Sequence, residues 1–166
     1  LRSFLPAPTL SFDVSPQTLL QDCRDAQRRA ASALAGIASL PQTTRTFDNT
    51  PWAFDRVLAQ LYEDTSSGQF MKSVSVSSAV RAAGNDCETE VGKLYIDVYS
   101  REDLYKALKD HAAQGEALKG DAARLLEKQL LDFRRSGLEL PGSERARLTI
   151  MSKRLTELES QFSRTI

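Results

Sequence analysis

Apolar residues along most of this chain recur every three or four positions, the spacing that places them on one face of an α-helix. The first run has spacings of 4, 3, 4, 3 and 4 and consists of Leu19, Cys23, Ala26, Ala30, Ala33 and Ile37. Because a helix has about 3.6 residues per turn, such a run forms one apolar stripe that must pack against other elements. The pattern predicts an all-α protein.

Capping residues and prolines divide the chain into predicted helices. Ser15 followed by Pro16 is typical of a helix start, and Pro41 should end that first helix. Asn49 or Thr50 can cap a second helix, which should end near residues 66–68. Residues 69–77 are ambiguous between a short strand and a helix connection, and we favour the connection.

Three further apolar runs complete the pattern. Residues 80–98 predict a long helix in which Gly84 and Gly92 indicate close backbone packing, because glycine in a helix interior costs about 1 kcal/mol relative to alanine. Residues 100–108 predict a helix with acidic residues in its first turn. Asp121 can cap the next helix, which carries Arg134 and Arg135 in its last turn and ends at Gly137.

The last predicted helix begins at Ser143. It carries an apolar seam with spacings of 3, 4, 3 and 4, made of Leu148, Met151, Leu155, Leu158 and Phe162. The seam could belong to a coiled coil, but it spans only about three heptads, so we expect it to pack inside the protein. In total we predict a single domain of about five to seven antiparallel amphipathic helices over residues 15–166, preceded by an extended arm over residues 1–14.

Composition and charge exclude several classes of function. Lys and Arg total 22, as do Asp and Glu, so no global positive field attracts nucleic acid or anionic lipid. No apolar run approaches the roughly 20 residues that a membrane-spanning helix needs. The sequence begins at Leu1, not at methionine, and its last helix has no evident stop signal before Ile166, so we expect a processed product or a fragment.

Cys23 and Cys87 are the only cysteines, and each lies among the apolar positions of a predicted helix. We favour two reduced, buried thiols. A structural disulfide or a reactive thiol is the alternative. No C-x-x-C pair occurs, which excludes a zinc knuckle.

The sequence lacks the motifs of the common hydrolases, although a Ser-His-Asp triad that uses His111 remains formally possible. His111 is the only histidine, whereas an H-E-x-x-H zinc helix needs two histidines four residues apart so that both face one metal. We expect His111 to lie on the surface at a helix end. There is no G-x-S-x-G elbow and no glycine-rich phosphate loop. We therefore assign no catalytic, cofactor-binding or metal-binding residue.

Charged pairs and clusters are interpreted as solvated helix faces. Residues two apart on a helix do not face each other, which applies to Glu88 with Glu90 and to Glu157 with Glu159. The basic residues of the last third are interspersed with acidic ones and lack aromatic stacking partners, so they do not indicate nucleic-acid binding. This set comprises Arg134, Arg135, Arg145, Arg147, Lys153 and Arg154.

Three segments resemble the N-terminal, non-catalytic region of the thimet oligopeptidase, neurolysin and saccharolysin family of zinc metallo-oligopeptidases. They are residues 46–50 (TFDNT), residues 100–105 (SREDLY) and, most specifically, residues 124–166. The last block has Arg124, Leu126-Glu127-Lys128, Arg134-Arg135-Ser136-Gly137-Leu138, Leu140-Pro141, Lys153-Arg154-Leu155, Glu157-Leu158 and Phe162 at the family's spacing. The resemblance covers residues 10–166.

The resemblance implies a helical domain that forms one wall of a channel for short peptides. The family's zinc ligands and general base lie in the other half and have no counterpart here, so the chain alone should be inactive, without zinc. The expected partner is that catalytic half or another helical protein, with short peptides possible. The alternative is a stand-alone helical peptide- or protein-binding module. We expect a cytoplasmic location, with the mitochondrion as the alternative, and no nucleic acid or membrane partner.

Overall fold

The computed structural model describes residues 12–163 and 165, so the predicted arm falls outside it except for residues 12–14. Within these residues the chain forms six α-helices, one 3-10 turn and no strand, which confirms the predicted all-α domain. The elements are α1 (Pro16–Ser39), η1 (Gln42–Thr44), α2 (Pro51–Val74), α3 (Ser78–Tyr99), α4 (Glu102–Ala113), α5 (Gly120–Arg135) and α6 (Gly142–Ser163).

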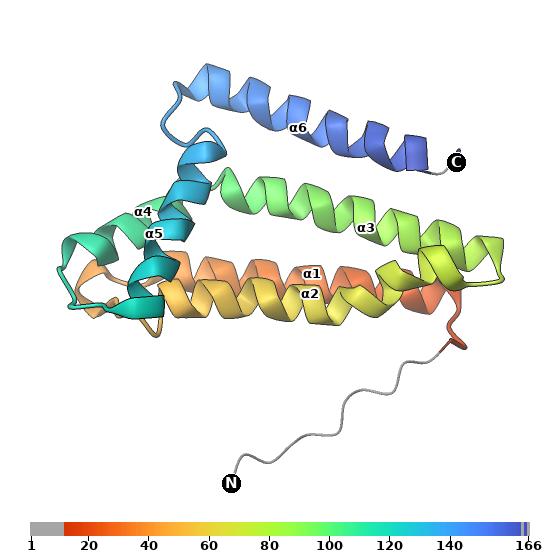
Figure 1. Cartoon of the computed structure of the whole chain (residues 1–166), viewed down its shortest axis with the longest axis horizontal. Helices are drawn as coiled ribbons and strands as arrows, with labels where there is room; N and C mark the ends of the chain where they lie inside the picture. The colour runs from red at the N-terminus through yellow and green to blue at the C-terminus, as the bar shows by residue number, and fades with distance from the viewer. Residues whose placement is uncertain (1–11, 164, 166) are drawn as a thin grey trace, which may run out of the picture.

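Three long helices form the body of the molecule. Figure 1 shows α1, α2 and α3 lying side by side, with the shorter α4 and α5 gathered at one end and α6 above α3. Helix α3 contacts α1, α2 and α6, whereas α4 and α5 contact each other. This arrangement gives every helix except α6 a buried stripe.

An aromatic cluster joins the long helices to α4 and α5. Phe133 of α5 lies with its ring centroid 5.6 Å from Phe54 of α2, 5.1 Å from Tyr99 of α3 and 5.7 Å from Tyr105 of α4. Phe54 and Phe133 are almost fully buried, and burial also raises the pKa of the Tyr99 hydroxyl to about 12. Offset and edge contacts of this kind stabilise a core beyond the area they bury.

Helices α2 and α3 approach each other most closely at Gly84. A Cβ atom on Gly84 would lie 2.8 Å from the backbone nitrogen of Lys72 and 2.9 Å from the carbonyl oxygen of Gly68. Real Cβ atoms do not come so near to backbone atoms. The predicted close packing is therefore confirmed at Gly84, and at Gly92 a Cβ would lie 3.1 Å from a methyl of Thr156 on α6.

We predict that Gly84→Ala lowers the free energy of unfolding by about 1–3 kcal/mol, because α2 must move away from α3. Gly36→Ala is the matched control, since that helical glycine has no neighbour within 4 Å of a Cβ. The control should raise stability by up to about 1 kcal/mol through helix propensity. Urea titration of both variants measures the difference, and a neutral Gly84→Ala would contradict the close contact.

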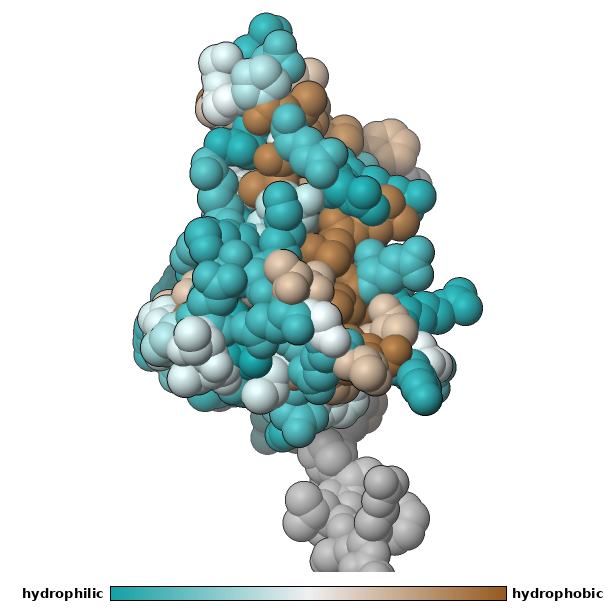
Figure 2. All heavy atoms as spheres, turned by 90° about the vertical axis from the view of Figure 1, so that its left-hand side faces the viewer, coloured by the Kyte–Doolittle hydropathy of each residue, from teal (hydrophilic) through white to brown (hydrophobic). Residues whose placement is uncertain are grey.

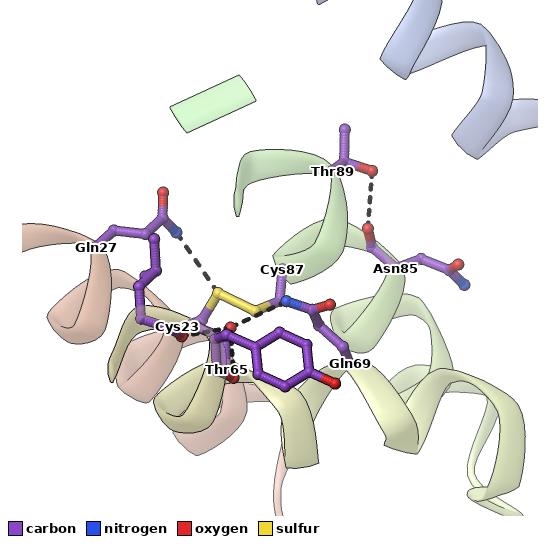
Figure 3. The surroundings of a disulfide bond; sticks show 9 residues. Cys23, Gln27, Thr65, Gln69, Asn85, Cys87 and Thr89 are labelled. Carbon is purple, nitrogen blue, oxygen red and sulfur yellow. Dashed lines mark hydrogen bonds between the residues drawn. A yellow bond between two sulfur atoms is a disulfide. The ribbon is translucent and has the colours of Figure 1, made fainter. Parts of the chain in front are cut away.

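Cys23 and Cys87 form a disulfide between α1 and α3, so the preference for reduced thiols was wrong. Both residues are buried, as expected, and their Cα atoms lie 5.9 Å apart. Figure 3 shows the bond between the two helices, with Gln27 donating to Cys23 Sγ at 3.5 Å and Gln69 donating to Thr65 Oγ1 at 3.0 Å beside it. The helical spacing placed each cysteine on a buried face but did not indicate that the two faces meet.

We predict that reduction of this disulfide lowers the free energy of unfolding by about 2–4 kcal/mol, because the bond closes a loop of 64 residues in the unfolded chain. Thermal unfolding with and without a thiol reductant measures the loss. A Cys23→Ser, Cys87→Ser double variant should resemble the reduced protein and should not respond to reductant. A response of that variant as large as the natural chain's would contradict the assignment.

Several predicted helix boundaries differ from the structure. Helix α2 does not end at residues 66–68 but continues to Val74, because Gly68 lies at the close contact with α3 and Leu19 packs against it. Residues 69–74 are thus helical. In α1 the buried position is Leu34, with Ala33 exposed. Asp121 lies in the first turn of α5 and does not cap it.

The glycine stop after α5 is confirmed. Gly137 has a φ of +93°, and Leu138 beyond it is buried and donates its N–H to the carbonyl of Phe133. This is the hydrogen-bond pattern of a left-handed helix end. Leu148 of α6 packs against Gly137.

The prediction that the apolar stripe of α6 packs inside the protein is wrong. Only Leu148 packs against the protein, whereas Met151, Leu155, Leu158 and Phe162 are exposed and no residue of α6 is buried. Among the described residues, no helix is long and apolar enough to cross a membrane.

Candidate functional site

The start of α2 is held in place by a buried arginine that the sequence analysis did not single out. Arg45 follows η1, and its side chain is only 7% exposed. Its guanidinium donates to Asp110 Oδ2 of α4 at 2.6 Å and to the carbonyl of Leu40 at 2.9 Å. The contact joins the end of α1, the η1 turn and α4, and it fixes the segment that leads into α2.

Asp110 is held ionised by its neighbours. Lys106 and, less strongly, Arg45 hold the pKa of the Asp110 carboxyl below its usual value. A carboxyl with a lowered folded-state pKa stabilises the protein above its unfolded-state pKa, and this contribution is lost as the pH falls through the folded value.

We predict that Asp110→Asn lowers the free energy of unfolding by about 2–3 kcal/mol at neutral pH, because it leaves the Arg45 charge buried without its partner. The difference from the natural chain should shrink as the pH falls below the ordinary carboxyl pKa. Asp97→Asn, which removes a half-exposed pair with Lys153, is the control and should cost less than about 1 kcal/mol. Equal losses in the two variants would contradict this role for Arg45.

His111 does not lie on the surface as predicted. It is 1% exposed and occupies the last turn of α4, on the same buried stripe as Leu104 and Leu108. Leu104, Leu108 and His111 are separated by 4 and then 3 residues, and this helical spacing was the signal in the sequence that the histidine is buried. Neither ring nitrogen has a hydrogen-bond partner among the described residues, and Nε2 lies 3.7 Å from Glu116 Oε2. The same carboxylate accepts the N–H of Phe47 at 2.9 Å.

An open groove runs between the start of α2 and the N-terminal half of α5. Its volume is about 610 Å³, within the range of ligand sites. Its apolar lining consists of Phe47, Trp52, Ala122 and Leu125. Trp52 is the only tryptophan of the chain and is 42% exposed. Gln129 of α5, which donates to the carbonyl of Pro51 at 2.9 Å, joins the two walls.

The charged residues of this groove have no ionic partners in the described part of the chain. Asp48 and Asp55 lie on the α2 side, Asp121 begins the α5 side, and Arg124 and Lys128 follow it. None of them makes an ion pair or a side-chain hydrogen bond within the described residues. The groove thus offers an aromatic surface and charges of both signs that have no partner among the described residues, which suits a short molecule that carries both charges.

The structure separates the other charged groups considered in the sequence. Glu88 pairs with Lys72 of α2 at 2.5 Å, whereas Glu90 lies 3.3 Å from Lys93. Glu157 contacts Lys93 at 3.0 Å, and the side chains of Lys93 and Arg154 hold the pKa of its carboxyl below the usual value. Half of the basic cluster is likewise paired, since Arg145 pairs with Glu102, Lys153 with Asp97 and Arg154 with Glu157.

No group of three or more histidine, cysteine or acidic side chains is placed to hold a metal ion among the residues that the structure describes. The two cysteines are bonded to each other, and the single histidine faces the core. The groove contains no histidine, cysteine or serine that could act as a nucleophile or a base near neutral pH. The groove offers apolar and charged side chains that can contact a bound molecule.

Comparison with known proteins relates the chain to thimet-type peptidases. The chain is 28% identical over 162 residues to the thimet-like oligopeptidase of Dictyostelium discoideum, a match that covers 95% of the chain. It is also 28% identical over 93 residues to a probable thimet oligopeptidase of Arabidopsis thaliana, which covers 56% of the chain. The chain is thus similar to thimet oligopeptidases. No family model matches it.

The match covers only a small part of each relative. It spans 24% of the length of the Dictyostelium thimet-like oligopeptidase and 13% of the Arabidopsis protein. The resemblance noted from residues 46–50, 100–105 and 124–166 is thereby confirmed at the level of the family, whereas the activity of the whole relatives does not transfer directly to these 166 residues.

Proposed function

We propose that this thimet-oligopeptidase relative is a non-catalytic helical segment of a zinc metallo-oligopeptidase, forming one wall of a channel that admits short peptides. The zinc site would lie outside these 166 residues. The observation that carries the proposal is the continuous similarity over 95% of the chain together with its coverage of only 24% of the relative. A segment that matches an oligopeptidase throughout, yet is a quarter of its length, fits a structural part of that enzyme.

The residues of the chain support a non-catalytic role. A zinc helix of the H-E-x-x-H type needs two histidines, and His111 is the only one in the sequence. That histidine is packed beside Glu116 in the core, where a substrate does not reach. Binding, positioning and exclusion of folded proteins are the contributions that remain for this segment.

The α2–α5 groove is the surface that we assign to the channel wall. A short peptide can place an apolar side chain on Trp52 and Leu125, its basic groups near Asp48 or Asp55, and its acidic groups near Arg124 and Lys128. Because these charges have no partners of their own in the described residues, pairing with a peptide disrupts no existing ion pair.

The same groove favours a second candidate, a stand-alone helical module that binds peptides without chemistry. The two functions differ in what accompanies peptide binding. An oligopeptidase segment is one part of a zinc-dependent peptidase, whereas a stand-alone module binds peptides in a native product that contains no zinc and cleaves nothing.

We predict that the purified 166-residue chain neither cleaves a quenched fluorescent peptide nor retains zinc stoichiometrically. The native gene product should cleave the same peptide and should lose this activity to a zinc chelator. Peptidase assays and metal analysis of both preparations test the proposal. Zinc-dependent turnover that co-purifies with the 166-residue chain would overturn it, and a native product without peptidase activity would favour the stand-alone module.

We predict that short peptides carrying both a basic and an acidic residue change the fluorescence of Trp52 in a saturable manner. An Arg124→Glu, Lys128→Glu variant should bind them about tenfold more weakly, because ionic hydrogen bonds contribute about 1.5–3 kcal/mol. Arg56→Glu, an exposed change on α2 outside the groove lining, should bind like the natural chain. If the groove and control variants bind equally, the wall lies elsewhere.

A further inference from the structure

Helix α6 is attached to the rest of the molecule by its polar side. Thr149 lies 3.1 Å from the Ser100 hydroxyl at the end of α3, and Ser160 accepts a hydrogen bond from Thr89 at 2.8 Å. Two ion pairs add to this contact, namely Lys93 with Glu157 at 3.0 Å and Lys153 with Asp97 at 2.5 Å. Helix α3 is the neighbour against which α6 packs.

The apolar side of α6 faces away from α3. Met151, Leu155, Leu158 and Phe162 are exposed by 63%, 56%, 46% and 68%, and their spacings of 4, 3 and 4 place them on one helix face. We call these four residues the α6 seam. Amphipathic helices of globular proteins normally bury such a stripe and expose the polar one, so α6 has the reverse of the usual orientation.

Other apolar residues are exposed near the start of α6. Figure 2 shows a band of hydrophobic residues that runs from the top of the molecule, where α6 lies, down across the face at the α4–α5 end. Ile150 and Leu140, which are also exposed, lie in α6 and in the loop before it. Apolar surface that is exposed in this way marks an interaction site.

Charges at the edge of the seam restrict what can cover it. Arg147 and Arg154 lie four residues before Met151 and Leu158, on the same flank of the helix, and both are exposed. Arg154 contacts Glu157 at 3.2 Å, whereas Arg147 makes no ion pair within the described residues. A covering helix that places carboxylates on this flank is favoured, because flanking charges select the partner and its orientation.

The length of the seam indicates that the covering helix belongs to the same polypeptide. Four side chains over about three turns bury far less than the roughly 800 Å² per partner of a stable association between separate molecules. An antiparallel pair of two copies would also bring one arginine flank against the other. A helix joined through the chain has a high effective concentration at the seam, so a short contact is sufficient.

We propose that the α6 seam is the docking site for an amphipathic helix with an acidic flank, supplied by a part of the oligopeptidase polypeptide outside these 166 residues. This inference rests on the proposed function. The Dictyostelium relative supports it, because 76% of that protein lies outside the match, which leaves ample chain for a covering helix.

The experiment uses Leu158→Cys as a probe of seam exposure. Because Cys23 and Cys87 are bonded to each other, the new cysteine is the only free thiol of the 166-residue chain, and in the native product its labelling is followed on the peptide that contains position 158. Its labelling rate is compared between the purified 166-residue chain and the native gene product carrying the same change. Val76→Cys, at a residue that is 99% exposed between α2 and α3, is the control, and Leu155→Cys is a second probe of the seam.

We expect labelling at position 158 to be at least about tenfold slower in the native product than in the purified chain, with no difference at position 76. Adding Arg147→Glu and Arg154→Glu should raise the rate in the native product. Equal rates at position 158 would overturn the proposal, as would protection in the purified chain that is lost on dilution, which would assign the seam to a second copy. Peptidase activity, measured on the same native preparation, tests the proposed function separately from the protection.

Discussion

The close contact between α2 and α3 at Gly84 fixes the frame of this protein. With no side chain at that position, the backbone of α3 approaches Lys72 and Gly68 of α2 to a distance that a Cβ atom would not permit. Helix α3 is thereby set where it meets α1, and Cys87 comes within bonding reach of Cys23. The opposite side of α3 is left for α6, and the end of α3 carries Tyr99 into the aromatic cluster around Phe133.

Local sequence signals predicted much of this fold because they depend on neighbours within one helix. Spacing and backbone preference predicted the glycine stop at Gly137, the buried stripe of α3 and the close packing at Gly84. The spacing of apolar residues did not predict which helix faces pack against each other. The disulfide, the buried Arg45–Asp110 pair and the exposed α6 seam each depend on contacts between segments far apart in the sequence.

His111 and the groove show the same limit at the candidate site. The stripe of α4 contained the signal for a buried histidine, but its place at a helix end led to the opposite prediction. The groove joins residues near position 50 with residues near position 125, and no motif links those two segments in the sequence. The family resemblance was recognised from the sequence because it depends on residue identities at fixed spacing.

The described residues combine a well-packed helical frame with two exposed surfaces, the α2–α5 groove and the α6 seam, for which we propose partners. The first suits a small charged molecule, and the second suits a helix. Both are expected of a segment that works beside a larger catalytic part, and neither requires chemistry from these residues.

The intact mass and zinc content of the native gene product test this account most directly. The account predicts a polypeptide several times heavier than the 18.4 kDa of this chain, with zinc bound stoichiometrically. A native product of 18.4 kDa without zinc would contradict it and would identify a small helical binding protein.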